Sequence, residues 1–495
     1  MTGDVTGDMT GDVADDIADG QWRRVHPLSP LLRMWAVLVG IVAVIAAQQA
    51  ETLGRLRDLL EDSPLPTGLV VVAVLVAIPV IFLIGWVVSL PWWRAAGYRI
   101  DGEEIAVRRG VVSRQLRTAR FDRVQAVDLV EPLAPRLFRL AGVKVETAGG
   151  SGSSVAVEYL PRQDAEDLRS HLLSLVHGVP GVPGAPGAPG APGQSDHGDD
   201  ATEDHGSAVP MIPITRSLVA AALSGATVLV VAGAAVALAT PAGLAVLLPV
   251  LAGAVPWVWG VLNTSWRFTA TLDGEVLGIT FGLTERRRQS VPLARVHAVE
   301  VSQPVAWRLL GWWKVRVDVA GYGAESSSDG STSTVLPVGD LSLALHVLET
   351  LTPLDSPAIA AVAHPEGRAR DGFPAAHTYL SPRNARWVSP VDRTRQGTTL
   401  VSDPGGSGQL TAVVSHHGLF RRAVSVISPA HIQELSYRRG PVQKVLGLAG
   451  VRFDLVPGPV SMSGRDLTTA DAVDLVTRLR ARRLPEPETH AVRPE

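Results

Sequence analysis

Cysteine is absent from all 495 residues of the sequence. Its absence excludes disulfide bonds, thiolate metal ligands and cysteine nucleophiles, although it does not identify the compartment. The sequence also lacks a strong charge imbalance, since the formal net charge is only −3. No overall basic field therefore attracts nucleic acid, and we expect no nucleic-acid partner.

Recognisable enzyme motifs are missing as well. The sequence contains no glycine-rich phosphate-binding loop, no dinucleotide fingerprint, no HExxH helix and no nucleophile elbow. His416 and His417 form the one adjacent histidine pair, but neighbouring side chains on a strand point to opposite faces and cannot share a metal ion. We therefore expect no enzymatic activity, no catalytic residue, no metal site and no cofactor.

What the sequence does contain is one segment that occurs three times without gaps. Residues 110–145 align with residues 282–317 and with residues 418–453. The aligned stretches include Arg123-Val124-Gln125-Ala126-Val127, Arg295-Val296-His297-Ala298-Val299 and His431-Ile432-Gln433-Glu434-Leu435. A repeat of this length marks a folded unit that is used three times. We call these copies repeats one, two and three.

The pattern within each repeat is mostly that of β-strands followed by one helix. Gly110, Gly282 and Gly418 separate consecutive apolar runs, where a turn or bulge needs glycine. Asp273-Gly274 is typical of a two-residue hairpin turn. A helix is indicated at the end of each repeat by apolar residues on one face: Ala165, Leu168, Leu172 and Val176; Leu341, Ala344, Leu348 and Leu351; Ala472, Leu475, Val476 and Leu479. Asp340 is the expected N-cap of the second helix.

Long apolar runs raise the mean hydropathy to +0.20. Four segments of about 20 residues have the length and the lack of charge that a membrane-spanning helix needs: about 31–50, 68–90, 217–239 and 242–262. Their flanking arginines predict that both hairpins point outward and that all three repeats lie in the cytoplasm. The sequence thus predicts a multi-pass plasma-membrane protein with both termini cytoplasmic.

The glycines, the RVQAV segment, the arginine–leucine pair at Arg136-Leu137 and the LAGVKVET strand (residues 140–147) together resemble the bacterial pleckstrin-homology-like (PH-like) domains of YdbS/YdbT-type membrane proteins. The resemblance covers most of residues 30–480. It implies a bent seven-stranded antiparallel sheet capped by a C-terminal helix in each repeat, and a setting in envelope stress or antimicrobial resistance. Repeat three departs from the pattern, with Gly440 in place of Pro132 and Pro304, and His431 in place of an arginine.

The predicted fold class is an α+β membrane protein with four transmembrane helices in two hairpins and three PH-like domains. The predicted boundaries are a disordered tail (1–27), hairpin 1 (28–93), PH-like domain 1 (94–177), a Gly/Pro-rich and acidic linker (178–210), hairpin 2 (211–265), PH-like domain 2 (266–352), a linker (353–385), PH-like domain 3 (386–483) and a disordered tail (484–495).

Two basic positions recur and are candidates for contact with a lipid or partner. The first is the aligned set Arg114, Arg286 and Arg422, to which Arg117 and Arg287 add charge. Their alternative interpretation is a solvated hairpin with charges that protect a sheet edge. The second is Arg136, Arg308 and Lys444, each followed by an apolar residue. These side chains could instead lie over their own core.

We expect a non-enzymatic scaffold that presents three PH-like domains to membrane lipids, to a protein partner or to further copies of itself. The alternative is a component of a membrane transport or export complex. That alternative is disfavoured because the four apolar segments contain no Asp, Glu, Lys or His, whereas ion-coupled transporters place ionisable groups at depth.

Overall fold

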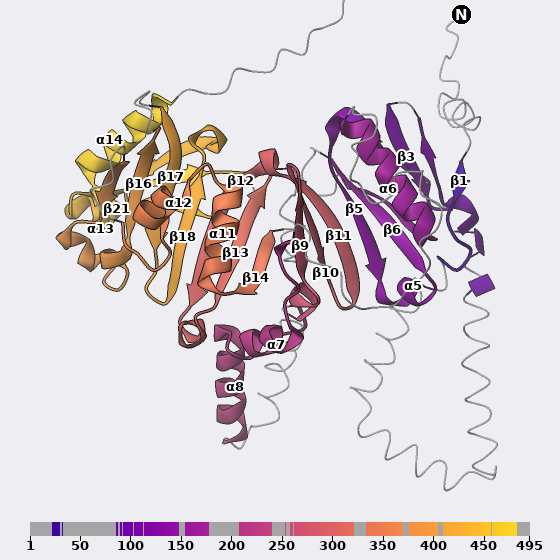
Figure 1. Ribbon diagram of the computed structural model, residues 1–495, viewed down its shortest axis with the longest axis horizontal. Helices are drawn as coiled ribbons and strands as arrows, with labels where there is room; N and C mark the ends of the chain where they lie inside the picture. The colour runs from indigo at the N-terminus through magenta and orange to yellow at the C-terminus, as the bar shows by residue number, and fades with distance from the viewer. Residues whose placement is uncertain are drawn as a thin grey trace, which may run out of the picture. The chain divides into compact units, whose positions relative to one another are not determined.

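The computed structural model (Figure 1) describes residues 22–29, 32, 86–87, 90–91, 93–101, 103–111, 113–147, 154–177, 207–239, 253, 258–260, 262–320, 333–369, 376–403, 409–456 and 458–482. The chain forms two compact units, one over 1–148 and 153–192 and the other over 149–152 and 193–495. The first unit contains repeat one, the second contains repeats two and three, and each unit is described by itself.

Repeat one has a four-stranded antiparallel sheet followed by a three-stranded one. The first sheet consists of β1 (Arg23–Arg24), β2 (Gly97–Ile100), β3 (Glu104–Arg109) and β4 (Gln115–Arg120), in this order. After η2 (Phe121–Arg123) come β5 (Val124–Pro132), α5 (Leu133–Leu137), β6 (Leu140–Thr147), β7 (Val155–Pro161) and α6 (Arg162–His177), with β5, β6 and β7 paired in succession. Ile105, Leu129 and Leu172 bring the two sheets and α6 into one core.

Repeat two follows the same order. Its first strands are β8 (Ser207–Val209), β9 (Thr269–Asp273), β10 (Val276–Phe281) and β11 (Glu285–Pro292), with α7 (Ile214–Ala222) and α8 (Gly225–Leu238) between β8 and β9. Then come η3 (Leu293–Arg295), β12 (Val296–Pro304), η4 (Ala306–Leu310), β13 (Trp313–Val319), β14 (Thr334–Gly339) and α11 (Leu341–Leu351). Trp313 is fully buried.

Repeat three is preceded by α12 (Ser356–Ala358) and a π-helical turn, η5 (Ile359–Ala363). Its four-stranded part contains β15 (Ala376–Leu380), β16 (Gly397–Ser402), β17 (Leu410–His417) and β18 (Arg421–Ile427), with η6 (Arg383–Trp387) and η7 (Arg393–Arg395) after β15. Then follow η8 (Pro429–His431), β19 (Glu434–Arg438), α13 (Pro441–Val445), β20 (Leu448–Asp454), β21 (Met462–Thr468) and α14 (Thr469–Arg480).

The first strand of every repeat is separated from the second by an intervening segment. That segment covers residues 25–96 in repeat one, 210–268 in repeat two and only 381–396 in repeat three. The strands β1, β8 and β15 consequently fall in stretches that the sequence assigned to a tail or a linker. These strands are two to five residues long, too short for a two-residue alternation to identify them.

Repeats two and three share one continuous sheet. Strand β12 pairs with β18 from Ala298↔Ile427 to Pro304↔Arg421. The resulting order is β14-β13-β12-β18-β17-β16-β15, and Figure 1 shows β12 and β18 side by side in it. The pairing satisfies the backbone groups of two edges that would otherwise be open to other strands. We call this β12–β18 junction the seam.

The turn predictions from glycine are confirmed. Gly110, Gly282 and Gly418 all have positive φ, between +84° and +120°, and all lie between paired strands. A Cβ atom at any of them would lie about 2 Å from the carbonyl oxygen three residues later. Asp273-Gly274 also forms the expected tight hairpin, since Asp273 pairs with Val276.

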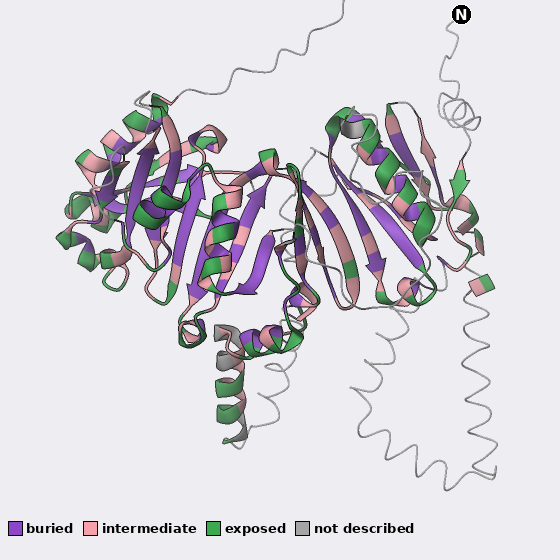
Figure 2. Cartoon of the chain, in the orientation of Figure 1, coloured by how far each residue is buried: buried purple, intermediate pink, exposed green. Residues whose placement is uncertain are grey.

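The predicted terminal helices are confirmed as α6, α11 and α14. Each covers its sheet with an apolar face, and Figure 2 shows the buried inner and exposed outer sides of α11 and α6. The Asp340 carboxylate caps α11 as expected, because its Oδ1 accepts a hydrogen bond of 2.9 Å from the Leu343 amide.

The four transmembrane helices are a wrong prediction. Across the described residues, the structure contains no helix with both the length and the apolar character to cross a membrane. The segment predicted over 217–239 is divided into α7 with nine residues and α8 with 14, and at about 1.5 Å per residue neither reaches about 30 Å. The other three segments lie almost entirely outside the described residues.

Hydroxyl side chains stabilise the break between α7 and α8. The Thr227 hydroxyl donates to the Ala221 carbonyl at 2.6 Å, and the Thr227 amide donates to Ser224 Oγ. These bonds replace part of the backbone pairing that a continuous helix would have. Hydropathy alone does not detect such a break. Because the multi-pass plasma-membrane localisation was inferred from the four predicted helices, that prediction is wrong as well.

Candidate binding surfaces

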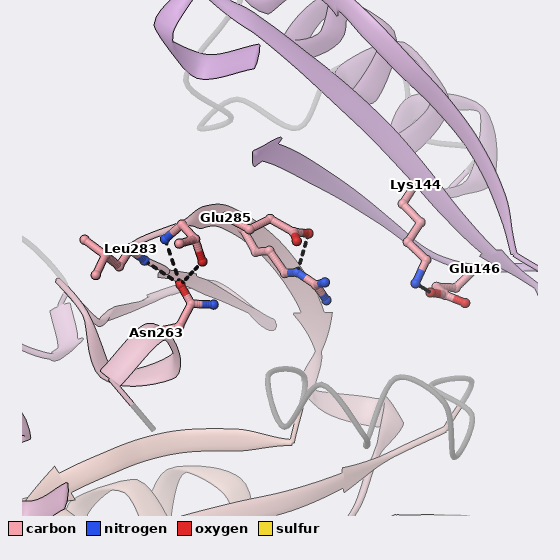
Figure 3. Close-up of polar contacts among 7 residues, drawn as sticks. Lys144, Glu146, Asn263, Leu283 and Glu285 are labelled. Atoms are coloured by element: carbon pink, nitrogen blue, oxygen red, sulfur yellow. Dashed lines mark hydrogen bonds and ion pairs between the residues drawn. The ribbon is translucent and has the colours of Figure 1, made fainter. Parts of the chain in front are cut away.

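The first candidate loop of basic residues lies in repeat one. Arg114 precedes β4 and Arg117 lies on it, and both side chains are exposed. Arg117 Nη1 donates to the Ser154 carbonyl at 3.4 Å. On strand β6, Lys144 is paired with the buried Glu146 at 2.7 Å (Figure 3). Repeat one thus exposes the predicted arginines and compensates the charge of its lysine.

In repeat two the equivalent turn is held in place by Asn263. Its Oδ1 accepts hydrogen bonds of 2.8–2.9 Å from the Leu283 and Thr284 amides and the Thr284 hydroxyl (Figure 3). This side chain therefore fixes the turn after Gly282 to the end of the segment inserted between β8 and β9. Asn263 also begins an Asn-Thr-Ser sequence, and these three bonds give it a structural role.

The two predicted arginines beyond this turn differ in exposure. Arg286 is exposed, whereas Arg287 is half-buried and pairs with Glu285 through a 2.8 Å contact. The charge of Arg287 is therefore partly compensated by Glu285 on the same strand. The structure places both on β11, and their contact with a lipid or partner stays a prediction.

Arg422 lies where PH-like repeats two and three meet. It lies on β18 opposite Gln303 of β12, at the seam. Its side chain is half-buried, and its Nε is buried without a hydrogen-bond partner among the described residues. The alignment thus identified equivalent positions, but the five predicted arginines do not gather into one site within either unit.

An exposed apolar side chain recurs in all three repeats, on the short helices α5, η4 and α13. We call these helices the exposed turns. Leu137 is 82% exposed, Leu309 87% and Val445 86%. Each directly follows the second recurrent basic residue, namely Arg136, Arg308 or Lys444. Large aliphatic side chains are seldom so exposed at one repeated position, so the turns are candidate contact surfaces.

The turn of repeat two is also the attachment point of α7. The Trp307 indole donates to the Ala220 carbonyl at 3.1 Å, and Ala220, Trp307 and Val338 form a small buried cluster. Trp307 and Trp313 are buried and fill the interior of repeat two. Trp312 packs edge-on against Trp307.

Two buried carboxylates, Glu300 and Asp318, lie at the seam. Glu300 on β12 is almost fully buried and pairs with Arg316 of β13 at 2.7 Å and with Arg421 of β18. Asp318 Oδ1 accepts a 2.9 Å bond from the Val460 amide of repeat three. Burial raises the pKa of Asp318 to about 7, even though the Val460 amide favours its charged form.

Two histidines stack across the same seam. The rings of His297 in β12 and His431 in η8 lie 4.1 Å apart between centroids, with planes inclined by 12°. The Nδ1 atoms of both are buried without a partner among the described residues. Burial, followed by the charge of His431, lowers the pKa of His297 to about 4, and burial also lowers the pKa of His431. Both rings are therefore neutral at physiological pH.

Comparison with known proteins connects this architecture with a family. The family described as "Bacterial PH domain" matches residues 35–176, 218–353 and 411–483, well over half of the chain. The chain belongs to the bacterial PH domain family. We therefore call repeats one, two and three PH domains 1, 2 and 3. Each match begins after the first strand of its domain, β1, β8 or β15.

A curated relative supports the same assignment. The "UPF0699 transmembrane protein YdbT" of Bacillus subtilis (strain 168) is 20% identical over 312 residues. The alignment covers 56% of this chain and 60% of that protein, so the chain spans less than two thirds of the relative's length. The resemblance to YdbT-type proteins inferred from the sequence is confirmed.

The stacked histidines predict a loss of stability in acid. The folded-state pKa of each lies below the ordinary 6.5, and that of His297 is about 4. The contribution of His297 to stability is therefore present above pH 6.5 and is lost as the pH falls through about 4. His297→Phe keeps a ring but cannot be protonated. We expect its melting temperature to fall less than that of the wild type between pH 6.5 and 4, measured by circular dichroism.

The matched control for this measurement is His346→Phe, because His346 is exposed on α11. Asp318 acts in the opposite direction, since its raised pKa stabilises the fold at low pH and that contribution is lost as the pH rises to about 7. The comparison is therefore made between variants at each pH. Parallel pH profiles for His297→Phe and the wild type would contradict the prediction.

Sequence reasoning did not find the groups that meet at the seam. Glu300, Asp318 and the two stacked histidines come together only through the pairing of β12 with β18. The sequence did contain a signal for the exposed turns, because a basic residue followed by an apolar one recurs in each repeat. That pattern does not reveal that the apolar side chain is exposed. Within the described residues, no group of three or more His, Asp or Glu side chains is arranged to hold a metal ion.

Proposed function

We propose that the protein is a non-enzymatic scaffold whose three PH domains bind one extended surface, and that this surface is an anionic lipid layer. The observation that carries the proposal is the threefold exposure of an apolar residue at one position, namely Leu137, Leu309 and Val445. Transferring one such side chain from water into an apolar environment is favourable by about 1.5–3 kcal/mol. A contact repeated in three tandem domains suits an extended partner.

The neighbouring charges favour an anionic partner. Arg136, Arg308 and Lys444 directly precede the exposed residues, so each turn combines one aliphatic side chain with one cation. This combination suits the boundary of a lipid layer, where apolar side chains enter the acyl region and basic groups interact with anionic headgroups. Each basic residue near such a surface contributes about 1 kcal/mol.

Tethering would strengthen individually weak contacts. Once one PH domain is bound, the chain keeps the others near the same surface at a high effective concentration, so the combined affinity exceeds that of any single domain. The family resemblance further suggests a role in envelope stress or antimicrobial resistance. A scaffold of this kind needs no reactive group, which agrees with the missing enzyme motifs.

The exposed turns provide the test. We expect the triple variant Leu137→Ser, Leu309→Ser, Val445→Ser to bind phosphatidylglycerol-containing vesicles at least about tenfold more weakly than the wild type, because each change removes apolar area worth about 1.4 kcal/mol or more. Its melting temperature should remain close to that of the wild type, since these side chains are exposed in the free protein. Vesicle co-sedimentation and circular dichroism measure the two quantities.

The control is Val473→Ser, because Val473 is 53% exposed on α14 but does not belong to an exposed turn. It should bind vesicles like the wild type. Crosslinking of the intact protein is run in parallel. If the triple variant binds vesicles normally but loses a crosslinked protein neighbour, the extended surface is a protein and the lipid proposal is wrong.

A further inference from the structure

Three arginines from separate elements converge near the seam of PH domains 2 and 3. Arg308 lies in η4, directly after β12. Arg422 lies on β18, which pairs with β12. Arg395 ends η7, just before β16. None of the three is a sequence neighbour of another, so the tertiary structure alone brings them together.

The turn between β17 and β18 anchors this group. Arg308 Nη2 donates a hydrogen bond to the Leu419 carbonyl, while the Leu419 amide donates to Asp392 Oδ1 at 2.8 Å. The turn is therefore bonded on one side to PH domain 2 and on the other to the segment that carries Arg395. This arrangement fixes Arg308 and keeps the Asp392 carboxylate engaged with the backbone.

The arginines have unused hydrogen-bonding capacity. The Nε atoms of Arg308 and Arg422 are buried and have no partner among the described residues. No carboxylate in the described part of the chain forms an ion pair with Arg308, Arg395 or Arg422. A buried donor without a partner is unfavourable, so these two side chains are not fully satisfied within the fold.

The three side chains, placed around the β17–β18 turn by these contacts, also repel one another. The pKa of Arg308 is lowered by burial and then by the charges of Arg422 and Arg395. The pKa of Arg395 is lowered by burial and then by Arg422 and the exposed Arg368. Two basic residues elsewhere are paired with acids, Lys144 with Glu146 and Arg452 with Asp454. The group at the seam is different because no acid offsets it.

We propose that Arg308, Arg395 and Arg422 form a binding site for a phosphate group at the junction of PH domains 2 and 3. Guanidinium groups match phosphate oxygens in geometry and charge and can bind them in pairs. The phosphate belongs either to a lipid headgroup or to a soluble ligand. The exposed Leu309 and Phe420 lie next to Arg308 and the anchored turn, and they would suit a lipid.

This proposal specifies the headgroup chemistry of the proposed lipid contact, but it can be tested separately from it. Arg308 belongs to the exposed turn of PH domain 2, whereas Arg395 and Arg422 belong to none of the exposed turns. A serine variant of the turns that abolishes vesicle binding would leave binding of inorganic phosphate intact, whereas substitution of the arginines would remove it.

The test uses the full chain and the double variant Arg395→Gln, Arg422→Gln, which leaves the anchoring Arg308 in place. Binding of inorganic phosphate is measured by isothermal titration calorimetry. Co-sedimentation uses phosphatidylcholine vesicles with and without phosphatidic acid. We expect the double variant to bind phosphate, or phosphatidic acid vesicles, at least about tenfold more weakly per arginine removed, because a charge-assisted hydrogen bond is lost each time.

The matched control is Arg438→Gln, Arg480→Gln, which removes the same charge from exposed positions on β19 and α14. It should bind like the wild type. In phosphate-free buffer the melting temperature of the Arg395→Gln, Arg422→Gln variant should be no lower than that of the wild type, because two mutually repelling charges are removed. A lower melting temperature would indicate a structural role for these arginines and overturn the proposal.

The two probes distinguish the sources of phosphate. Arginine-dependent binding of inorganic phosphate supports a site for a soluble phosphate ligand. Arginine-dependent binding of phosphatidic acid vesicles alone supports a lipid headgroup. If the wild type binds neither probe, or if the double variant binds both as well as the control does, the site does not exist.

Discussion

Replacing Glu300 with alanine is expected to destabilise the unit that contains PH domains 2 and 3 by about 1.5–3 kcal/mol, because two partly exposed arginines lose a charge-assisted hydrogen-bond partner. Glu300 is almost fully buried and pairs with Arg316 and Arg421 from the two sides of the seam. Without it, two guanidinium groups would repel each other. In thermal unfolding of the full chain, the melting temperature of this unit should fall by about 2–4 °C for each kcal/mol of unfolding free energy that is lost.

The lysine beside this carboxylate adds to the cost. The pKa of Lys314 is lowered to about 8 by burial and by the charges of Arg316 and Arg421, while Glu300 acts to raise it. Loss of Glu300 thus leaves three cations close together. Glu300→Gln keeps the side-chain volume and one acceptor oxygen, so its loss of stability should be smaller. Equal melting temperatures for Glu300→Ala and the wild type would show that solvent screens the seam.

The second large effect is expected at the recurrent glycine turn. Gly418→Ala forces a non-glycine residue to a φ of +84° and places its Cβ 1.9 Å from the Arg421 carbonyl oxygen. The left-handed conformation costs about 1–2 kcal/mol, and relief of the clash costs about 1–3 kcal/mol more. We expect a large drop in the melting temperature, measured by circular dichroism.

Gly447 provides a control within the same PH domain. Its φ is +68°, but a Cβ there would meet no atom within 4 Å. Gly447→Ala therefore carries only the conformational cost and should be clearly more stable than Gly418→Ala. Equal losses for the two variants would mean that the turn after β17 moves to accept the side chain, contrary to the prediction.

The sequence identified the parts of the fold that depend on neighbouring residues. Positive φ at Gly110, Gly282 and Gly418, the turn at Asp273-Gly274 and the Asp340 cap were all predicted correctly, since each depends on the backbone within about four residues. The helices α6, α11 and α14 were also predicted, because their apolar spacing follows the helical period. The PH-like resemblance supplied the type of sheet.

The wrong predictions share a cause. Hydropathy over 217–239 treated the segment as one helix, although Ser224 and Thr227 bond to the backbone and accompany a break at Leu223. The apolar composition reports how readily side chains leave water, but not where the helix ends. In the same way, strand β8 was not found because its three residues carry too short a pattern.

The candidate site was predictable only in part. Arg308 and Arg422 were recognised as recurrent basic positions, but nothing in the alignment relates them to each other or to Arg395. Alignment relates Arg422 to Arg114 and Arg286 but does not show that it lies at the seam. That placement arises from the pairing of β12 with β18.

By itself, the sequence determined that one β-rich unit is used three times, where its chain turns, which helices close it and that cysteine chemistry plays no part. The tertiary structure decided that β12 and β18 join two PH domains into one sheet, and thereby which charges are buried in pairs and which remain unbalanced. Turns and helix faces depend on residues close in the chain, whereas burial and electrostatic compensation depend on groups that only folding brings together.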